Sequence, residues 1–259
     1  MLNQRVEISD TAYMDTYILD DLDNTRKRKS VIICPGGGYE FCSPSEADPV
    51  AARLNAAGFN AFVLWYTTPP PTCTQPLKEL SDAVCTVRRN ADKWCADAEK
   101  ITVMGFSAGG HLAASLGAFW DKPELGANGM NKPNALVLAY PVISAEPEIR
   151  HDGTFKALLG GDFSEENASR YSLEKFVNRK TPQTFIWHTQ EDDGVPVENS
   201  MLFVTELQKN RIPFEMHIFP YGEHGLSLGT KELYPNADDH HSSIWMDLCI
   251  RWMEACLLD

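Results

Sequence analysis

Residues 105–109 read Gly-Phe-Ser-Ala-Gly and lie between the apolar run ITVM and a run of small residues that continues to position 119. This order predicts a buried strand, a sharp turn with Ser107 at its apex, and a helix that begins directly after the turn. The flanking glycines let the backbone turn tightly without Cβ clashes. The helix would point its N-terminal amides and the positive end of its dipole toward the serine oxygen. The chain must therefore combine strands and helices, with a polar side chain at the end of a strand.

The rest of the chain repeats the alternation of apolar strand-like runs and helix-like segments. Six such runs are predicted as buried strands, at residues 31–34, 61–65, 101–104, 135–140, 184–187 and 214–219. Apolar residues at three- and four-residue spacing mark the helices between them, as at Leu80, Val84, Val87, Ala91 and Trp94. Strand–helix alternation of this kind predicts an α/β fold, with a mostly parallel sheet covered by helices on both faces.

Other segments extend this prediction to a single domain over residues 1–259. A hairpin is expected around residues 6–20, and the basic run at 26–29 is expected to be a solvated turn before the first buried strand. A helix should begin near Pro49, with Glu46 and Asp48 ahead of it as favourable charges. The last two helices are predicted at 197–210 and 240–257. Residues 144–180 depart from the alternation, and we expect short helices there that form a small cap over the site.

Two further polar residues follow strand-like runs after Ser107. Asp192 comes just beyond the run at 184–187, and His224 comes just beyond the run at 214–219. Open α/β sheets place their chemistry where strands give way to loops. A serine hydroxyl needs a base to take its proton, and an imidazole oriented by a carboxylate can supply that base. The sequence therefore predicts a catalytic triad of Ser107, His224 and Asp192.

The segment PGGG at residues 35–38 follows the first buried strand. Backbone without side chains allows a ligand to approach closely, so the amides of Gly37 and Gly38 can point at a substrate oxygen. The amide of Ala108, directly after the nucleophile, would supply a further donor. Such donors stabilise the oxyanion of acyl transfer, and the loss of one typically costs ~10²–10³ in rate.

These motifs together resemble the α/β-hydrolase superfamily, in which the order Ser–Asp–His is typical. The PGGG segment takes the place of the HGGG motif of hormone-sensitive-lipase-like esterases, with Pro35 where that motif has histidine. The stretches ICPGGGYEFCSPSEADPVAARL, GFSAGGHLAA, HTQEDDGVPVENS and GEHGLSL are similar to bacterial acetyl esterases often grouped with acetylxylan esterases. The resemblance runs from about Val31 to the C-terminus. Its D-x-x-V-P spacing selects Asp192 as the acid, with Asp193 as the alternative beside Glu191.

The remaining histidines and three tyrosines need separate interpretation. His111 is one helical turn after Ser107 and His188 directly precedes the acid loop; we expect both to be structural, with His188 ordering that loop by hydrogen bonds. His151 and His217 have no catalytic context, and His240 and His241 are expected to be exposed at the start of the last helix. Tyr39, Tyr66 and Tyr140 follow or end strands, and either line the substrate pocket or belong to the core.

Composition limits the classes of partner. The net charge is −13 and disfavours nucleic acid and anionic membranes. No run approaches the ~18 apolar residues of a membrane span, and the N-terminus lacks the pattern of a secretory signal. The seven cysteines are odd in number and have no metal-ligand spacing, so we expect no metal, no other cofactor and a cytoplasmic location. The oligomeric state stays open.

The resemblance implies a serine carboxylesterase that removes small acyl groups, acetyl above all, from carbohydrate such as acetylated xylo-oligosaccharides. An arylformamidase or other small-amide hydrolase would use the same triad. A serine peptidase of the prolyl-oligopeptidase type is disfavoured because the chain has no room for its large gating domain. A non-catalytic binder with this fold is disfavoured because every member of the triad is present.

Overall fold

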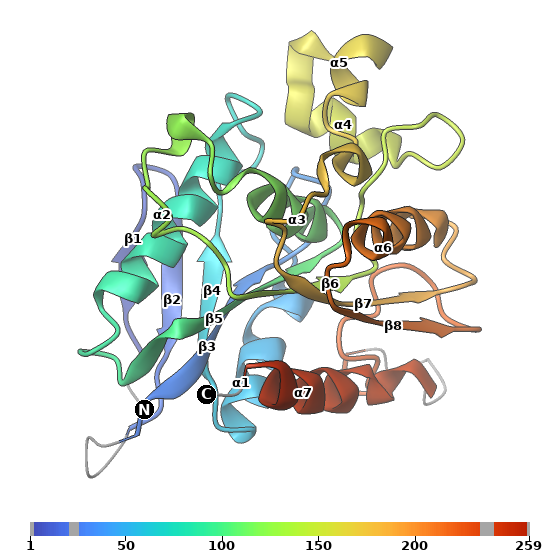
Figure 1. Ribbon diagram of the computed structural model, residues 1–259. Coiled ribbons are helices and arrows are strands. Elements are labelled where there is room, and N and C mark those ends of the chain that lie inside the picture. Colours follow the sequence, from blue (N-terminus) through green and yellow to red (C-terminus); the bar gives the residue numbers. More distant parts are fainter. Residues whose placement is uncertain (1–2, 21–25, 234–240, 258–259) are drawn as a thin grey trace.

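The computed structural model describes residues 3–20, 26–233 and 241–257. Its core is an eight-stranded sheet with the strand order β1-β2-β4-β3-β5-β6-β7-β8 (Figure 1). The strands β1 and β2 pair antiparallel with each other and β2 pairs antiparallel with β4, while the pairs from β4 to β8 are parallel. The strands are β1 (Arg5–Glu7), β2 (Tyr13–Tyr17), β3 (Arg28–Cys34), β4 (Asn60–Trp65), β5 (Ala96–Phe106), β6 (Ala135–Ala139), β7 (Gln183–Thr189) and β8 (Phe214–Phe219).

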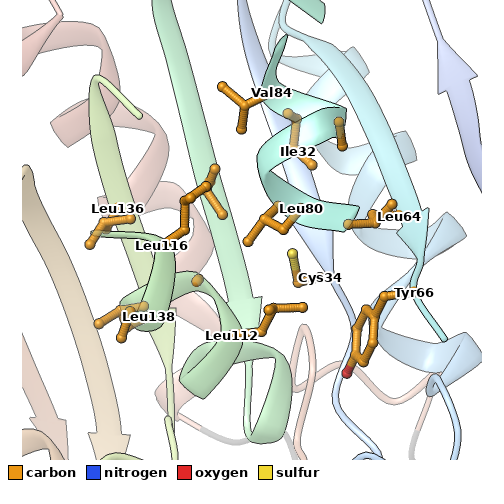
Figure 2. Close-up of a cluster of buried hydrophobic side chains, with 14 of the residues drawn as sticks. Ile32, Cys34, Leu64, Tyr66, Leu80, Val84, Leu112, Leu116, Leu136 and Leu138 are labelled. Carbon is orange, nitrogen blue, oxygen red and sulfur yellow. The ribbon is translucent and has the colours of Figure 1, made fainter. Parts of the chain in front are cut away.

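Helices cover both faces of this sheet. On one face lie α2 (Gln75–Arg89), α3 (Ala108–Phe119) and α6 (Glu198–Asn210), and on the other lie α1 (Asp48–Ala56) and α7 (Trp245–Cys256) (Figure 1). Successive side chains of a strand point to opposite faces, so a strand covered on both sides must be apolar throughout. In β3, Ile32 and Cys34 pack toward α2 and α3, as Figure 2 shows, whereas Val31 and Ile33 belong to the cluster under α1 and α7.

The chain reverses its direction of travel across the sheet between β3 and β5. It passes from β3 to the neighbouring β4 and then crosses back to β5 on the other side of β3. Loops that follow adjacent parallel strands on either side of such a switch point separate and leave a crevice at the carboxyl ends. The PGGG segment follows β3 and Ser107 follows β5, so the topology brings these two segments together.

The α/β fold with a mostly parallel sheet is therefore confirmed, and each predicted strand forms. Three boundaries were wrong. The helix whose apolar face was expected to include Ala91 and Trp94 ends at Arg89, and a turn follows it. Arg28 and Lys29 of the basic run begin β3, so only the first part of that run precedes the strand. The last helix begins at Trp245, because residues 241–244 form a 3-10 turn; position 240 is outside the described residues.

Residues 144–180 form a succession of short helices, which we call the helical insertion. It contains α4 (Asp152–Leu159), α5 (Glu165–Ser169) and the 3-10 turns η3 (Gly160–Asp162) and η4 (Leu173–Phe176). The helices α4 and α5 stand beyond the sheet, above α3 and α6 in the view of Figure 1. The segment has a small apolar cluster of its own, in which Phe155 and Leu159 pack against Val142 and Val195. That cluster attaches the insertion to the loops at the carboxyl end of the sheet.

Across the described residues, no helix has both the length and the apolar character that a bilayer crossing requires.

Candidate active site

Ser107 occupies a strained turn between β5 and α3. Its backbone has φ 51° and ψ −117°, a conformation that L-residues rarely adopt. The neighbouring glycines are required by contact: a Cβ at Gly105 would lie 2.1 Å from the Gly109 carbonyl oxygen, and one at Gly109 would lie 2.0 Å from the Cys34 carbonyl oxygen. Strand, helix and the end of β3 thus meet at van der Waals distance. This packing fixes the position of the serine hydroxyl.

The structure brings Ser107, His224 and Asp192 into one chain of hydrogen bonds. Ser107 Oγ lies 2.8 Å from His224 Nε2, and His224 Nδ1 lies 2.7 Å from Asp192 Oδ2. Because a carboxylate only accepts, Nδ1 carries the hydrogen and Nε2 is free to take the serine proton. The three groups come from loops after β5, β8 and β7, so the arrangement exists only in the folded sheet.

Asp192 is buried and firmly held. Its Oδ1 accepts hydrogen bonds from the amides of Gly194 at 3.0 Å and Val195 at 2.7 Å. Burial raises the pKa of Asp192, but hydrogen bonds from His188 and His224 outweigh that effect and hold the pKa well below its usual range. The neighbouring Asp193 is exposed. It is therefore Asp192, rather than Asp193, that the structure places at the imidazole.

The adjacent residues position the acid and base loops. His188 Nε2 lies 2.8 Å from the Val195 carbonyl oxygen and 3.2 Å from Asp192 Oδ2, while its Nδ1 lies 2.8 Å from Ser200 Oγ. These bonds match the ordering role that the sequence suggested for His188. Glu191, the third acid of the cluster, accepts a hydrogen bond from the amide of Gly222 on the histidine loop. The acid loop thus supports the base loop directly.

Gly37 and Gly38 face the cavity in front of Ser107, with φ angles of 120° and 65°. Within the described segments, the amides of Gly37, Gly38 and Ala108 have no hydrogen-bond partner in the protein. Unpaired amides beside a serine nucleophile are available to an oxygen of a bound substrate. The geometry is thus suited to the oxyanion role predicted for these three residues.

The glycine loop is held by the buried carboxyl group of Glu46, a residue expected from the sequence only to favour the start of a helix by its charge. Glu46 is 3% exposed; its Oε2 accepts from the Gly36 amide at 2.7 Å, and its Oε1 accepts from the Tyr140 hydroxyl at 2.7 Å. The Tyr140 oxygen in turn accepts from the amide of Ser227, on the loop after His224. Burial raises the pKa of Glu46, and the bonds from Tyr140 and Gly36 oppose that rise. Glu46 thereby connects the oxyanion loop to the base loop.

The three tyrosines lie behind the loops, and their burial supports the second of the two roles left open for them, a place in the core. Tyr66 donates its hydroxyl hydrogen to the Pro35 carbonyl at 2.6 Å, and Tyr39 bonds His111 Nδ1 at 3.0 Å. All three rings are at most 2% exposed, and none lines the cavity beside Ser107. Aromatic side chains at strand ends here fill the core and use their polar tips to hold loop backbone. Tyr66 and Glu46 hold the backbone of the PGGG segment at Pro35 and Gly36.

The cavity beside Ser107 has a volume of about 330 Å³, within the range of small-molecule sites. Besides the catalytic residues and the two glycines, it is lined by His151 and Gly153 of the helical insertion and by Glu40 and Phe41. Among the described residues, no group of histidine, cysteine and acidic side chains is arranged to hold a metal ion.

His151 is a cavity residue that the sequence did not indicate. It precedes α4, and its Nδ1 lies 3.2 Å from the Thr154 amide and 2.8 Å from the Thr154 hydroxyl. Because the amide can only donate, Nδ1 is an acceptor, and the hydrogen of the neutral ring is on Nε2. Burial, followed by the charge of His224, lowers the pKa of His151. In the sequence, the one feature that could have drawn attention to His151 is its position at the start of a helix, where histidine is uncommon.

The histidines at 111, 217 and 241, which belong to the described part of the chain, do not line the cavity. His111 is buried between Tyr39 and the Tyr171 carbonyl, and burial lowers its pKa to about 4, which fits the structural role expected for it. His217 lies on β8 and bonds Glu215. His241 is exposed at the turn before α7, as expected.

Comparison with known proteins places these observations in a family. Residues 14–207 match the family model BD-FAE. The chain is 41% identical over 217 residues to endo-1,4-beta-xylanase B of Butyrivibrio fibrisolvens, covering 80% of this chain and 34% of that protein. It is 29% identical to an acetylxylan esterase of Xylanibacter ruminicola, covering 78% of this chain and 42% of that protein. The chain thus spans less than half the length of either relative.

Among solved structures, an acetyl ester-xyloside bifunctional hydrolase from Caldicellulosiruptor lactoaceticus superposes with a TM-score of 0.84. It is 35% identical, and the match covers 97% of this chain and 96% of that one. The resemblance to α/β-hydrolases of the acetyl esterase type, first drawn from the motifs, is confirmed at the level of family and fold.

Proposed function

The chain belongs to the BD-FAE family, and on that premise we propose that it is a serine carboxylesterase that removes small acyl groups, acetyl above all, from carbohydrate. The observation that carries the proposal is the unbroken path from Asp192 Oδ2 through His224 to Ser107 Oγ, beside three unpaired amides. Acyl transfer needs a nucleophile, a base and an oxyanion site within one cavity, and all three are supplied here.

In the first half of the reaction, Ser107 Oγ attacks the ester carbonyl carbon while His224 Nε2 takes the hydroxyl proton. The carbonyl oxygen becomes an oxyanion that the amides of Gly37, Gly38 and Ala108 stabilise. Asp192 stabilises the imidazolium that forms at His224. The imidazolium then gives its proton to the alcohol oxygen as the C–O bond breaks, which leaves an acyl group on Ser107.

In the second half, His224 takes a proton from water, whose oxygen attacks the acyl carbon. The new tetrahedral intermediate collapses, Ser107 Oγ recovers a proton from His224, and the carboxylic acid leaves. His151 is neutral in this scheme because its pKa is lowered, so it does not oppose the charge that appears on His224. Its Nε2 hydrogen is then available to an alcohol or ring oxygen of the substrate.

Carbohydrate acetate is the substrate class that the relatives favour. One solved neighbour is named an acetyl ester-xyloside hydrolase, and one curated relative an acetylxylan esterase. The net charge of −13 suits neutral substrates better than anionic ones. Cytoplasm is the compartment that we propose, on the odd number of cysteines in the chain.

The test is hydrolysis of p-nitrophenyl acetate, butyrate and octanoate beside a Ser107→Ala control, followed by acetate release from acetylated xylo-oligosaccharide. We expect acetate to be the preferred acyl group, with turnover lost in the control. Turnover of the synthetic esters without acetate release from the sugar would leave the mechanism in place and would exclude acetylated carbohydrate as the substrate. A chain that cleaves p-nitrophenyl formamides and no ester would instead be an amide hydrolase.

A further inference from the structure

A second hollow adjoins the catalytic cavity and shares Glu40 and Phe41 with it. Its volume is about 670 Å³, and Tyr13 and Trp65 contribute to its lining. We call it the aromatic hollow and define it by Tyr13, Glu40, Phe41, Trp65 and Thr67. Because the two spaces meet at the segment that follows the oxyanion glycines, a substrate whose carbonyl lies at Gly37 can extend from one into the other.

The aromatic side chains of this hollow are fixed by contacts outside it. Trp65 Nε1 donates to Asp15 Oδ2 at 3.0 Å, and the same carboxylate accepts from Arg5 Nε at 3.0 Å. The Arg5 guanidinium carbon lies 3.6 Å from the centroid of the Tyr13 ring, and the Tyr13 and Trp65 rings are 6.2 Å apart at 31°. A platform that is already ordered loses little conformational entropy when a ligand stacks on it.

Phe41 links the platform to the catalytic centre. Its side chain is 57% exposed, although its backbone amide donates to the Gly37 carbonyl oxygen at 3.3 Å. An aromatic ring exposed beside the oxyanion loop, and continuous with the platform of Tyr13 and Trp65, offers apolar area that a ligand can remove from water. A bound substrate passing from the catalytic cavity to the hollow would cover it.

The polar groups of the hollow indicate which substrate that is. Glu40 is exposed and has no ion-pair partner within the described residues, and hydroxyl groups of Thr11 and Thr67 lie 2.6 Å apart at the rim. A sugar ring has apolar C–H faces that stack on aromatic rings and hydroxyls around its edge that bond to carboxylate and hydroxyl groups. A fatty acyl chain has no group that could bond to Glu40, and an acidic sugar would be repelled by it.

We infer that the aromatic hollow binds the sugar units next to the acetylated one, so that the enzyme acts on acetylated neutral oligosaccharides in preference to acetylated monosaccharides. This inference rests on the proposed esterase function and adds to it a site for the alcohol portion. It predicts that kcat/KM rises with chain length and that Phe41 and Trp65 are responsible for the rise.

The experiment measures acetate release from acetylated xylose, xylobiose and xylotriose, with p-nitrophenyl acetate as the reference ester. In the wild-type protein we expect the trimer to exceed the monosaccharide in kcat/KM by about tenfold, the order of one good aromatic contact. Phe41→Ala and Trp65→Leu, which each remove a ring, should each reduce that ratio, and the double variant should abolish it. Phe41→Tyr, which keeps a ring in place, should retain it.

Two controls separate the hollow from general effects. Phe214→Ala removes another exposed ring, 37% exposed, from the far edge of the sheet and should leave both the ratio and p-nitrophenyl acetate turnover unchanged. Titration of the protein with unacetylated xylotriose should quench tryptophan fluorescence in the wild type and less so in Trp65→Leu, which reports binding without any turnover.

The outcomes distinguish the hollow from the esterase assignment. If the protein hydrolyses p-nitrophenyl acetate but has equal kcat/KM for all three sugars, the inference about the aromatic hollow is overturned and the esterase assignment stands. Methyl cinnamate, an ester with an aromatic acyl group, is assayed beside the sugars. A Phe41→Ala defect confined to this ester would also overturn the inference, because the hollow would then receive the acyl group. Failure of every ester would overturn the function and the inference together.

Discussion

The carboxyl end of the sheet and the helical insertion both contribute to the catalytic cavity, but they are held in different ways. The triad and the oxyanion loop are attached to buried strands and are fixed by buried hydrogen bonds, such as those of Glu46 and Asp192. The insertion adds Leu158, Leu173 and Val177 to the main core and has a small apolar cluster of its own. Within it, the buried Arg150 side chain bonds the exposed carboxylates of Asp152 and Glu165. The difference suggests that the sheet determines the chemistry while the insertion and the hollow determine which substrate is accepted.

The largest effect is expected at the acid of the triad. Asp192→Asn should leave the protein folded and reduce kcat by up to about 10⁴, because an amide no longer fixes the imidazole tautomer or stabilises its charge. Asp193→Asn is the matched control and should retain wild-type kcat for p-nitrophenyl acetate. Equal losses of kcat in the two variants would show that Asp192 is not the specific partner of His224.

Substitution of Glu46 should have the next largest effect on kcat, because Glu46 positions the oxyanion loop rather than contacting the substrate. Glu46→Gln leaves one acceptor for two donors, so either the Gly36 amide or the Tyr140 hydroxyl loses its partner. We expect kcat to fall by about 10–100-fold with little change in KM, since a small displacement of the oxyanion loop acts on the transition state.

Asp48→Asn serves as the control for Glu46, because this carboxylate is two residues away and bonds the Tyr17 hydroxyl on the surface. Circular dichroism and thermal unfolding establish that both variants fold. An unchanged kcat in Glu46→Gln would remove Glu46 from the support of the oxyanion loop.

His151 tests the insertion directly. His151→Asn keeps a side-chain acceptor for the Thr154 amide, since asparagine is a good helix cap, but it removes the Nε2 donor from the cavity. We expect kcat/KM for acetylated sugar to fall by about tenfold, the scale of one hydrogen bond, and to fall much less for p-nitrophenyl acetate. Equal losses for the two substrates would contradict a role in substrate selection.

The smallest effect is expected on stability, at the residue that joins the two regions. His111 lies on α3 of the sheet layer, and its Nε2 is 3.1 Å from the Tyr171 carbonyl of the insertion. Its pKa is about 4 in the folded protein, against about 6.5 when unfolded. The unfolded chain therefore binds more protons, and stability is lost as the pH falls from 6.5 toward 4.

This loss should reach about 2 kcal/mol by pH 5, or a few degrees in Tm. His111→Gln retains an acceptor for Tyr39 and a donor for Tyr171 but has no titrating ring, so its Tm should depend less on pH over this interval. Thermal unfolding of both proteins from pH 7 to pH 5 measures the difference. Identical pH profiles would mean that His111 is not the titrating link.

Much of the site could be predicted because its signals are local. A serine between two glycines, a run of glycines after a strand, and an acid and a histidine after later strands are each visible within a few residues. Glu46 and His151 were missed because their roles depend on contacts across the chain: the Tyr140 partner of Glu46 is 94 positions away, and the ring of His151 lies near that of His224 across 73 positions. The role of the tyrosines stayed open for the same reason, since a strand end does not reveal which side of a loop its side chain occupies.

The sequence by itself determined the α/β fold and the three residues that we propose as the triad, because hydrophobic periodicity, turn chemistry and residue order are encoded along the chain. Only the tertiary structure decided what holds the oxyanion loop and which side chains face the cavity. Those features depend on distances between segments that lie far apart in the sequence, and such distances are fixed only when the sheet and its covering helices pack together.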